Sequence, residues 1–194
     1  MATKIPAIMP GEVSARPERL PEDGEFLLSL YASTRRPELT GLGWSAAQED
    51  AFIRMQFDAQ DRHYRRSFPD AGYSVICVGG ERAGRLIVNR ARGEILIVDI
   101  ALLPQFRGAG VGGGLVRRLI DEADAGRLPL RCHVARGNDA RRFWERAGFV
   151  AQDEDATYVA MEPVDSQGAY FSTMSPTCGS AATTCLTALP RTAR

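Results

Sequence analysis

The sequence has few cysteines, and they form no metal-binding pattern. Its four cysteines (Cys77, Cys132, Cys178 and Cys185) occur singly, with no CxxC pair. The two histidines do not stand at the spacing that a zinc site requires. We therefore expect no bound metal. Cys77 and Cys132 lie in apolar runs, where we expect buried, reduced thiols.

Neither an excess of charge nor a long apolar run is present. Acidic and basic residues number 24 each, so the composition indicates neither nucleic acid nor an anionic membrane as a partner. No apolar stretch approaches the roughly 20 residues that cross a bilayer. The N-terminal stretch MATKIPAIMPGEV lacks the apolar core of a signal peptide. We therefore expect a cytoplasmic protein.

Hydrophobic periodicity predicts an α/β (α+β) domain. The chain has 194 residues, 44% of them hydrophobic, which is enough for one domain with a sizeable core. Apolar spacing of the helical period predicts helices at 22–35, 45–68, about 115–123 and 138–148. Alternating or continuous apolar runs predict strands at 12–17, 73–78, 82–91, 93–104, 128–134, 149–152 and 156–163.

The helix at 45–68 has a clear start and a predicted buried face. Ser45 followed by Gln48 is a capping box, in which each residue bonds the other's backbone N–H. We expect Phe52, Met55 and Ala59 to form its apolar stripe.

Composition changes near the C-terminus. Ten of the last thirty residues are Ser or Thr and three are charged. Such a segment has little apolar surface to offset the entropy of ordering. We predict an N-terminal lead-in at 1–11, one domain at 12–163 and a flexible tail at 164–194.

Glycine is concentrated in one place, the stretch QFRGAGVGGGL, where five of the residues 108–114 are glycine. An apolar strand precedes this stretch and a helix follows it. The free amides and the dipole at a helix N-terminus attract anions, and side-chain-free residues let a phosphate approach closely. Arg107 adds a positive charge at the entry. The stretch therefore predicts a phosphate cradle.

Two common phosphate motifs fit poorly. Gly108-x-Gly110-x-x-Gly113 has the spacing of a dinucleotide fingerprint, but the next predicted strand, 128–134, carries no carboxylate for a ribose. No Gly-Lys-Ser/Thr follows, which excludes a Walker loop.

A third pattern fits the strand, the proline, Gln105-x-x-Gly108-x-Gly110 and the helix together. It resembles the acetyl-CoA motif of the GNAT N-acetyltransferases. NDARRFWERAGF (138–149) resembles the second signature of that family, and the order of elements agrees over about 12–163. The resemblance implies a central mixed, mostly antiparallel sheet of six to seven strands with about four flanking helices. It also implies acetyl-CoA as co-substrate, with no metal.

The resemblance further implies which residues contact acetyl-CoA. Strand 93–104 would splay from its neighbour and bind the pantetheine arm through its backbone. Asn138 and Arg141 would contact the lower arm, and Trp144 would face the sulfur. The implied backbone contacts are Ile100, Ala101 and Leu102 for pantetheine, and Arg107, Gly108, Ala109, Gly110, Val111, Gly112 and Gly113 for the pyrophosphate.

The implied chemistry is direct attack of an amine on a thioester, with the backbone of Leu102 among the donors that steady the oxyanion. In many relatives a tyrosine protonates the departing thiolate, but here that position is Trp144, whose indole is no useful acid. For the base, Asp99 and Glu94 are the candidates on strand 93–104, where relatives often carry acidic residues. Asp99 is equally well interpreted as a structural carboxylate paired with an arginine. Strand alternation predicts Asp99 on the face opposite Leu102, and Glu94 on the same face as Leu102.

The acceptor is less constrained. Tyr31, Trp44, Phe52 and Tyr64 are candidates to line its site, and each is also a candidate core residue. We expect a small-molecule or peptide amine as acceptor, and a homodimer is left open. Because the tyrosine is missing, a non-catalytic acyl-CoA-binding or sensing module on the same fold is the alternative function.

Overall fold

The computed structural model describes residues 13–91 and 93–164 of the chain. The predicted lead-in (1–11) and all of the predicted tail except Val164 lie outside the described residues, as do Cys178 and Cys185.

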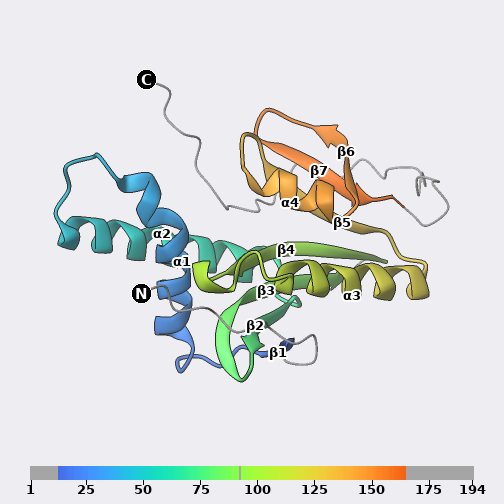
Figure 1. Ribbon diagram of the computed structural model, residues 1–194, viewed down its shortest axis with the longest axis horizontal. Coiled ribbons are helices and arrows are strands. Elements are labelled where there is room, and N and C mark those ends of the chain that lie inside the picture. The colour runs from blue at the N-terminus through green and yellow to red at the C-terminus, as the bar shows by residue number, and fades with distance from the viewer. Residues whose placement is uncertain (1–12, 92, 165–194) are drawn as a thin grey trace.

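The predicted helices and strands are present, with shifts of a few residues at their ends (Figure 1). The strands are β1 (Val13–Pro17), β2 (Gly72–Val78), β3 (Glu81–Ala91), β4 (Glu94–Leu102), β5 (Leu130–Ala135), β6 (Phe149–Glu154) and β7 (Tyr158–Pro163). The helices are α1 (Gly24–Leu39), α2 (Ala46–Ser67), α3 (Val111–Gly126) and α4 (Ala140–Arg146), with a 3₁₀ turn at Pro104–Phe106.

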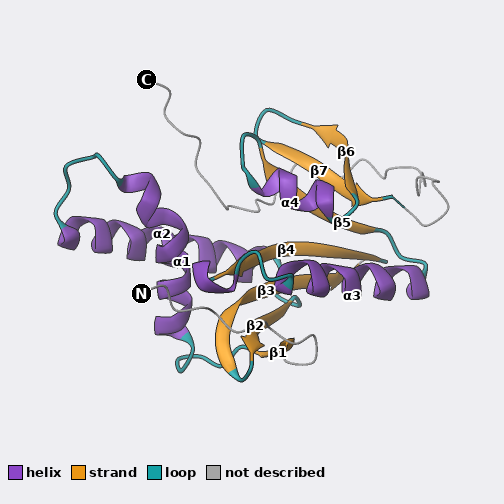
Figure 2. Cartoon of the chain, in the orientation of Figure 1, coloured by secondary structure: helices purple, strands orange, loops and turns teal. Residues whose placement is uncertain are grey.

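All the described strands form one sheet in the order β1-β2-β3-β4-β5-β7-β6. Only the β4–β5 pair is parallel, and the other neighbours are antiparallel. The predicted mixed, mostly antiparallel sheet is therefore confirmed, as are the four helices around it within the described residues. In Figure 2 the sheet divides into β1 to β4 and the smaller group of β5, β6 and β7, which meet at β4 and β5.

The two faces of the sheet carry different helices. One core cluster joins buried residues of β2 to β5 with α3 and α4, including Val116 and Trp144. A second cluster packs Tyr64 and Phe68, from α2 and its end, against Ile87, Leu96 and Val98 of β3 and β4. The sheet is thus covered by α3 and α4 on one face and by α2 on the other.

The strands β4 and β5 separate after a short pairing. Their register runs only from Ile95↔Leu130 to Ile97↔Cys132, although β4 continues to Leu102 and β5 to Ala135. The rest of β4 therefore pairs with β3 alone. Its other edge opens toward a gap, as the resemblance implies.

A β-bulge in β4 lies where the splay begins. The register with β3 passes from Val88↔Ile97 to Ile87↔Asp99, so Val98 is the additional residue. Leu96 and Val98 consequently pack toward α2, whereas Ile100 and Leu102 pack toward α3 and α4. Asp99 does lie opposite Leu102. The prediction that Glu94 shares the face of Leu102 is wrong, because the bulge reverses the alternation.

The predicted start of α2 is confirmed and its predicted buried face is wrong. The capping box between Ser45 and Gln48 is present with both bonds. The buried residues of α2 are Ile53, Gln60 and Tyr64, whereas Met55 is 57% exposed. The polar Gln60 is buried because it accepts a hydrogen bond from Arg85 on β3 at 3.0 Å.

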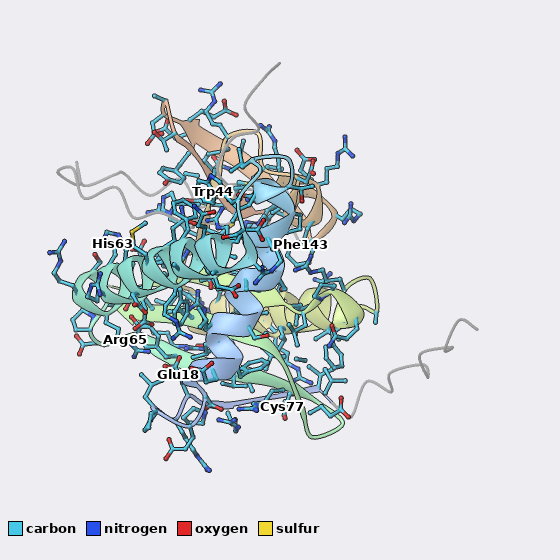
Figure 3. All side chains as sticks on the ribbon, turned by 90° about the vertical axis from the view of Figure 1, so that its left-hand side faces the viewer. Glu18, Trp44, His63, Arg65, Cys77 and Phe143 are labelled. Carbon is cyan, nitrogen blue, oxygen red and sulfur yellow. The ribbon has the colours of Figure 1, made fainter. Side chains whose placement is uncertain are left out.

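Ion pairs hold the first strand and the helices to the sheet. Asp23, the buried residue just before α1, accepts hydrogen bonds from the two terminal guanidinium nitrogens of Arg16, each at 2.7 Å. Glu18 and Arg65 of α2 point toward one another and are paired (Figure 3). The Arg16 hydrogen bonds hold the pKa of Asp23 well below its usual range.

Cys77 and Cys132 are buried, as predicted. Within the described residues, no helix has the length and apolar character that crossing a membrane requires. No cluster of His, Cys, Asp or Glu suited to a metal ion occurs in that part of the chain.

Candidate active site

A cavity of about 560 Å³ lies between the splayed end of β4, the glycine stretch and α4. Its lining includes most of the positions that the sequence predicted. The described residues that line it are Ile100, Leu102, Arg107, Gly108, Gly110, Val111, Gly112, Gly113, Ala140, Phe143, Trp144, Arg146 and Ala147.

The glycine stretch forms the entry to α3. Gly108 and Gly110 have φ values of +75° and +82°, the left-handed region that glycine adopts without strain. The first amide bonded within the helix is that of Gly114, which donates to the Gly110 carbonyl at 2.9 Å. The amides of Val111, Gly112 and Gly113 therefore remain free for an anion.

Glycine at 112 also allows a close approach between helices. A Cβ there would lie 3.4 Å from the Phe143 ring, so α4 packs directly on the first turn of α3. A Cβ at Gly113 would meet nothing within 4 Å. Gly113 therefore faces open space in the cavity.

Arg107 links the glycine stretch to the end of β4. Its Nε donates to the Leu102 carbonyl at 2.7 Å. Partial burial lowers the pKa of Arg107, but an arginine remains cationic because its pKa starts above 12. No carboxylate among residues 13–91 and 93–164 lies within ion-pair distance of Arg107.

The backbone of β4 presents Ile100 and Leu102 to the gap. Leu103 N–H donates to the Ala83 carbonyl on β3, and bonded pairs alternate along an antiparallel ladder. Ala101 and Asp99 are therefore bonded to β3, and the polar groups of Ile100 and Leu102 point away from it. Arg107 bonds the Leu102 carbonyl, so the N–H groups of Ile100 and Leu102 are the strand donors that face the gap.

Four predicted contact residues, Ala101, Ala109, Asn138 and Arg141, do not line the cavity. The backbone of Ala101 is turned toward β3, and its side chain lines a separate small cavity. Arg141 is exposed and bonds Glu145 at 2.9 Å and Glu154 at 3.2 Å. Asn138 does not cap α4, whose N-cap is Asp139; instead its Oδ1 accepts the Ala140 N–H at 2.8 Å. The amide side chain folds back on its own turn.

Ala109, between Gly108 and Gly110, is the fourth of these residues. Ala140, Phe143, Arg146 and Ala147 were missed as cavity residues. Their helical spacing had indicated only that Ala140, Phe143 and Ala147 share a face with Trp144.

Trp144 contributes to the floor of the cavity. It is 2% exposed and packs edge-to-face against Phe143 and Phe149, with ring centroids 5.1 and 5.0 Å apart. Its ring is therefore fixed by the core as well as adjacent to the ligand space.

Asp99 lies on the other face of β4. It is 1% exposed, and its Oδ2 accepts from Arg85 Nε at 2.9 Å and lies 2.7 Å from Arg85 Nη2. Its Oδ1 has no partner among the described residues and borders a small cavity of about 10 Å³, room for about one water. This placement favours the structural reading of Asp99.

The two histidines lie outside the cavity lining. His133 is on β5, one residue beyond the last pair with β4. Burial lowers the pKa of His133, and the positive charge of Arg131 lowers it further, so the ring is neutral at pH 7. His63 is on α2, and its buried Nε2 has no partner in the described part of the chain.

The aromatic candidates for an acceptor site divide into two groups. Tyr31 and Tyr64 are core residues, 8% and 0% exposed. Trp44, labelled in Figure 3, is 39% exposed and packs edge-to-face on Phe52 at 5.1 Å.

The comparisons with known proteins agree with this geometry. The model of the acetyltransferase (GNAT) family matches residues 35–149. The chain belongs to the GNAT acetyltransferase family. The matched range contains the glycine stretch and α4, which form two walls of the cavity. No curated protein was found to match the sequence.

Several solved structures share the fold at low sequence identity. The PaiA N-acetyltransferase of Thermoplasma acidophilum, solved in complex with coenzyme A, is 17% identical with a TM-score of 0.59. The comparison covers 78% of this chain and 98% of that one. PH1933 from Pyrococcus horikoshii is 18% identical with a TM-score of 0.56, over 78% and 98% of the two chains. A GCN5-related N-acetyltransferase from Rhodopseudomonas palustris is 21% identical with a TM-score of 0.52, over 77% and 94%.

Proposed function

We propose that this GNAT protein transfers the acetyl group of acetyl-CoA to a primary amine of a small molecule or peptide. The observation that carries the proposal is the cavity between the splayed strands and the N-terminus of α3. It combines a free strand edge for pantetheine with free amides for a pyrophosphate. The residues present fit coenzyme A, because Arg107 and Arg146 are the charged groups of the described lining, and no described acidic residue lines it.

In this mechanism the neutral acceptor amine attacks the thioester carbonyl, and the C–S bond breaks as the coenzyme A thiolate departs. The proton that the amine nitrogen loses passes to water. The Leu102 N–H donates to the oxygen that gains negative charge. Asp99 is ion-paired on the opposite face of β4, which supports a role in holding the strand rather than in taking the proton. Trp144 occupies the place of the proton-donating tyrosine of relatives. A thiol pKa near 8.5, by analogy with cysteine, permits departure without an acid.

The test is release of the coenzyme A thiol from acetyl-CoA with a panel of primary amines. We expect turnover with at least one amine class and none with the matched tertiary amines. Tight acetyl-CoA binding without turnover on any amine would favour the alternative, an acyl-CoA-binding module. The alternative rests on Trp144, which stands where many relatives have a proton-donating tyrosine.

Substitution of Trp144 tests whether the missing acid limits the rate. Trp144→Tyr introduces a phenol with a pKa near 10, at a packing cost of about 1–2 kcal/mol because the ring is smaller. Trp144→Phe has a similar cost and no proton to donate. We expect the tyrosine variant to turn over faster than the phenylalanine variant at pH 7–9. The advantage should disappear as the pH rises through the phenol pKa.

The measurement is the pH profile of kcat for both variants with the amine found in the screen. Identical profiles would show that thiolate departure without an acid is not rate-limiting.

A further inference from the structure

Two arginines on different walls provide the charge of the large cavity. Arg107 comes from the turn before α3, and Arg146 is the last residue of α4. Arg146, like Arg107, has no carboxylate within ion-pair distance among the described residues. The other arginines of α4 differ: Arg141 is paired with Glu145 and Glu154, and neither Arg141 nor Arg142 lines the cavity.

The pyrophosphate does not require both arginines. The free amides of α3 and its dipole, equivalent to about half a positive charge, already face that end of the cavity. Arg107 enters the same turn and adds a full charge. The third phosphate of coenzyme A, the 3′-phosphate on the ribose, has a second pKa near 6 and carries between one and two negative charges at pH 7.

The position of Arg146 differs from that of the α3 amides. Phe143 contacts the first turn of α3 at Gly112, and Arg146 follows Phe143 by three residues on the same side of α4. One turn of helix rises about 5.4 Å. The guanidinium of Arg146 therefore extends from a point about one turn beyond the wall that Gly112 and Phe143 form.

We propose that Arg146 binds the ribose 3′-phosphate of acetyl-CoA and makes the site select coenzyme A over its 3′-dephospho form. The inference rests on the proposed function, because it requires acetyl-CoA in the large cavity. Arg107 and the amides of α3 bind the pyrophosphate, which both forms carry. Selection between the two forms then depends on a single charged contact.

The experiment measures the affinity of the full chain for coenzyme A and for 3′-dephospho-coenzyme A by titration calorimetry. The variants are Arg146→Gln and the control Arg142→Gln, an exposed arginine of the same helix outside the lining. We expect the wild type to prefer coenzyme A about tenfold, or about 1.4 kcal/mol. Arg146→Gln should lose that preference by weakening coenzyme A alone, while Arg142→Gln keeps it. Higher salt should reduce the preference.

Other results would overturn the inference. Equal weakening of both ligands by Arg146→Gln would mean that the arginine contacts a group common to both. Equal binding of both ligands by the wild type would mean that the 3′-phosphate is not recognised. In either case coenzyme A still binds, and the proposed function stands. A wild-type protein that binds neither ligand would overturn the inference together with the proposed function.

Discussion

Gly113→Asp is expected to lower the affinity for acetyl-CoA at least tenfold, or about 1.4 kcal/mol, while the chain remains folded. Gly113 lines the large cavity in the first turn of α3, and its Cβ would meet nothing within 4 Å. The new carboxylate therefore fits sterically in the empty protein. It extends into the space where the free amides would hold the pyrophosphate, and it repels that group.

The stability of the variant is expected to be unchanged or slightly higher. Aspartate has a better helix propensity than glycine, and an acidic side chain in the first turn interacts favourably with the helix dipole. Gly113 is preferable to Gly110 for this test. The φ of Gly110 is +82°, so any side chain there would strain the backbone as well as block the site.

Gly114→Asp is the matched control. Gly114 is the next residue of α3, is exposed, has nothing within 4 Å of its Cβ position and does not line the cavity. It gains the same charge and a similar propensity. Calorimetry should show near-normal acetyl-CoA affinity for Gly114→Asp and a large loss for Gly113→Asp. Equal affinities for the two variants would remove the phosphate-cradle assignment.

The sequence was sufficient to predict the glycine turn before α3, because glycine is required there by the local backbone. A left-handed φ at Gly108 and Gly110 requires glycine whatever the rest of the fold does. The helix that follows has an apolar face that its spacing predicts, and Val116 and Leu119 on that face are buried. Local rules of this kind depend only on neighbours in the chain.

The bulge in β4 could not be predicted in the same way. Its additional residue, Val98, is as apolar as its neighbours, so the run from Ile95 to Ile100 shows no break in pattern. The bulge exists through pairing with β3, which is distant in sequence. The bulge reverses the face on which the side chains before it lie relative to those after it. For this reason the prediction that Glu94 shares the face of Leu102 is wrong.

The buried face of α2 was mispredicted for a related reason. Hydrophobicity favoured Met55 over Gln60, yet Gln60 is buried and Met55 is exposed. Gln60 is satisfied by a guanidinium from β3, and a buried polar group costs little when it is hydrogen-bonded. A partner from another element cannot be seen in the periodicity of one helix. Arg146 was missed as a cavity residue because the resemblance implies contacts at Asn138, Arg141 and Trp144 and none at the last residue of α4.

Asp99→Asn is expected to destabilise the protein by about 3–5 kcal/mol, because it leaves the guanidinium of Arg85 buried without a countercharge. The side chains of Arg85 and Asp99 are 6% and 1% exposed. Urea unfolding at pH 7 measures the loss. The control is Asp50→Asn, which breaks the exposed pair of Asp50 with Arg36 and should cost less than about 1 kcal/mol.

A double variant separates the structural role of Asp99 from a catalytic one. Arg85→Met with Asp99→Val replaces both charges by apolar side chains, and such replacements of buried ion pairs are often neutral or stabilising. We expect the double variant to regain part of the stability that Asp99→Asn loses, because buried Gln60 loses its hydrogen bond from Arg85. It should release coenzyme A thiol at a rate within tenfold of the wild type. General base catalysis contributes about 100- to 10,000-fold. A double variant that folds and binds acetyl-CoA, yet loses that much turnover, would instead identify Asp99 as the proton acceptor.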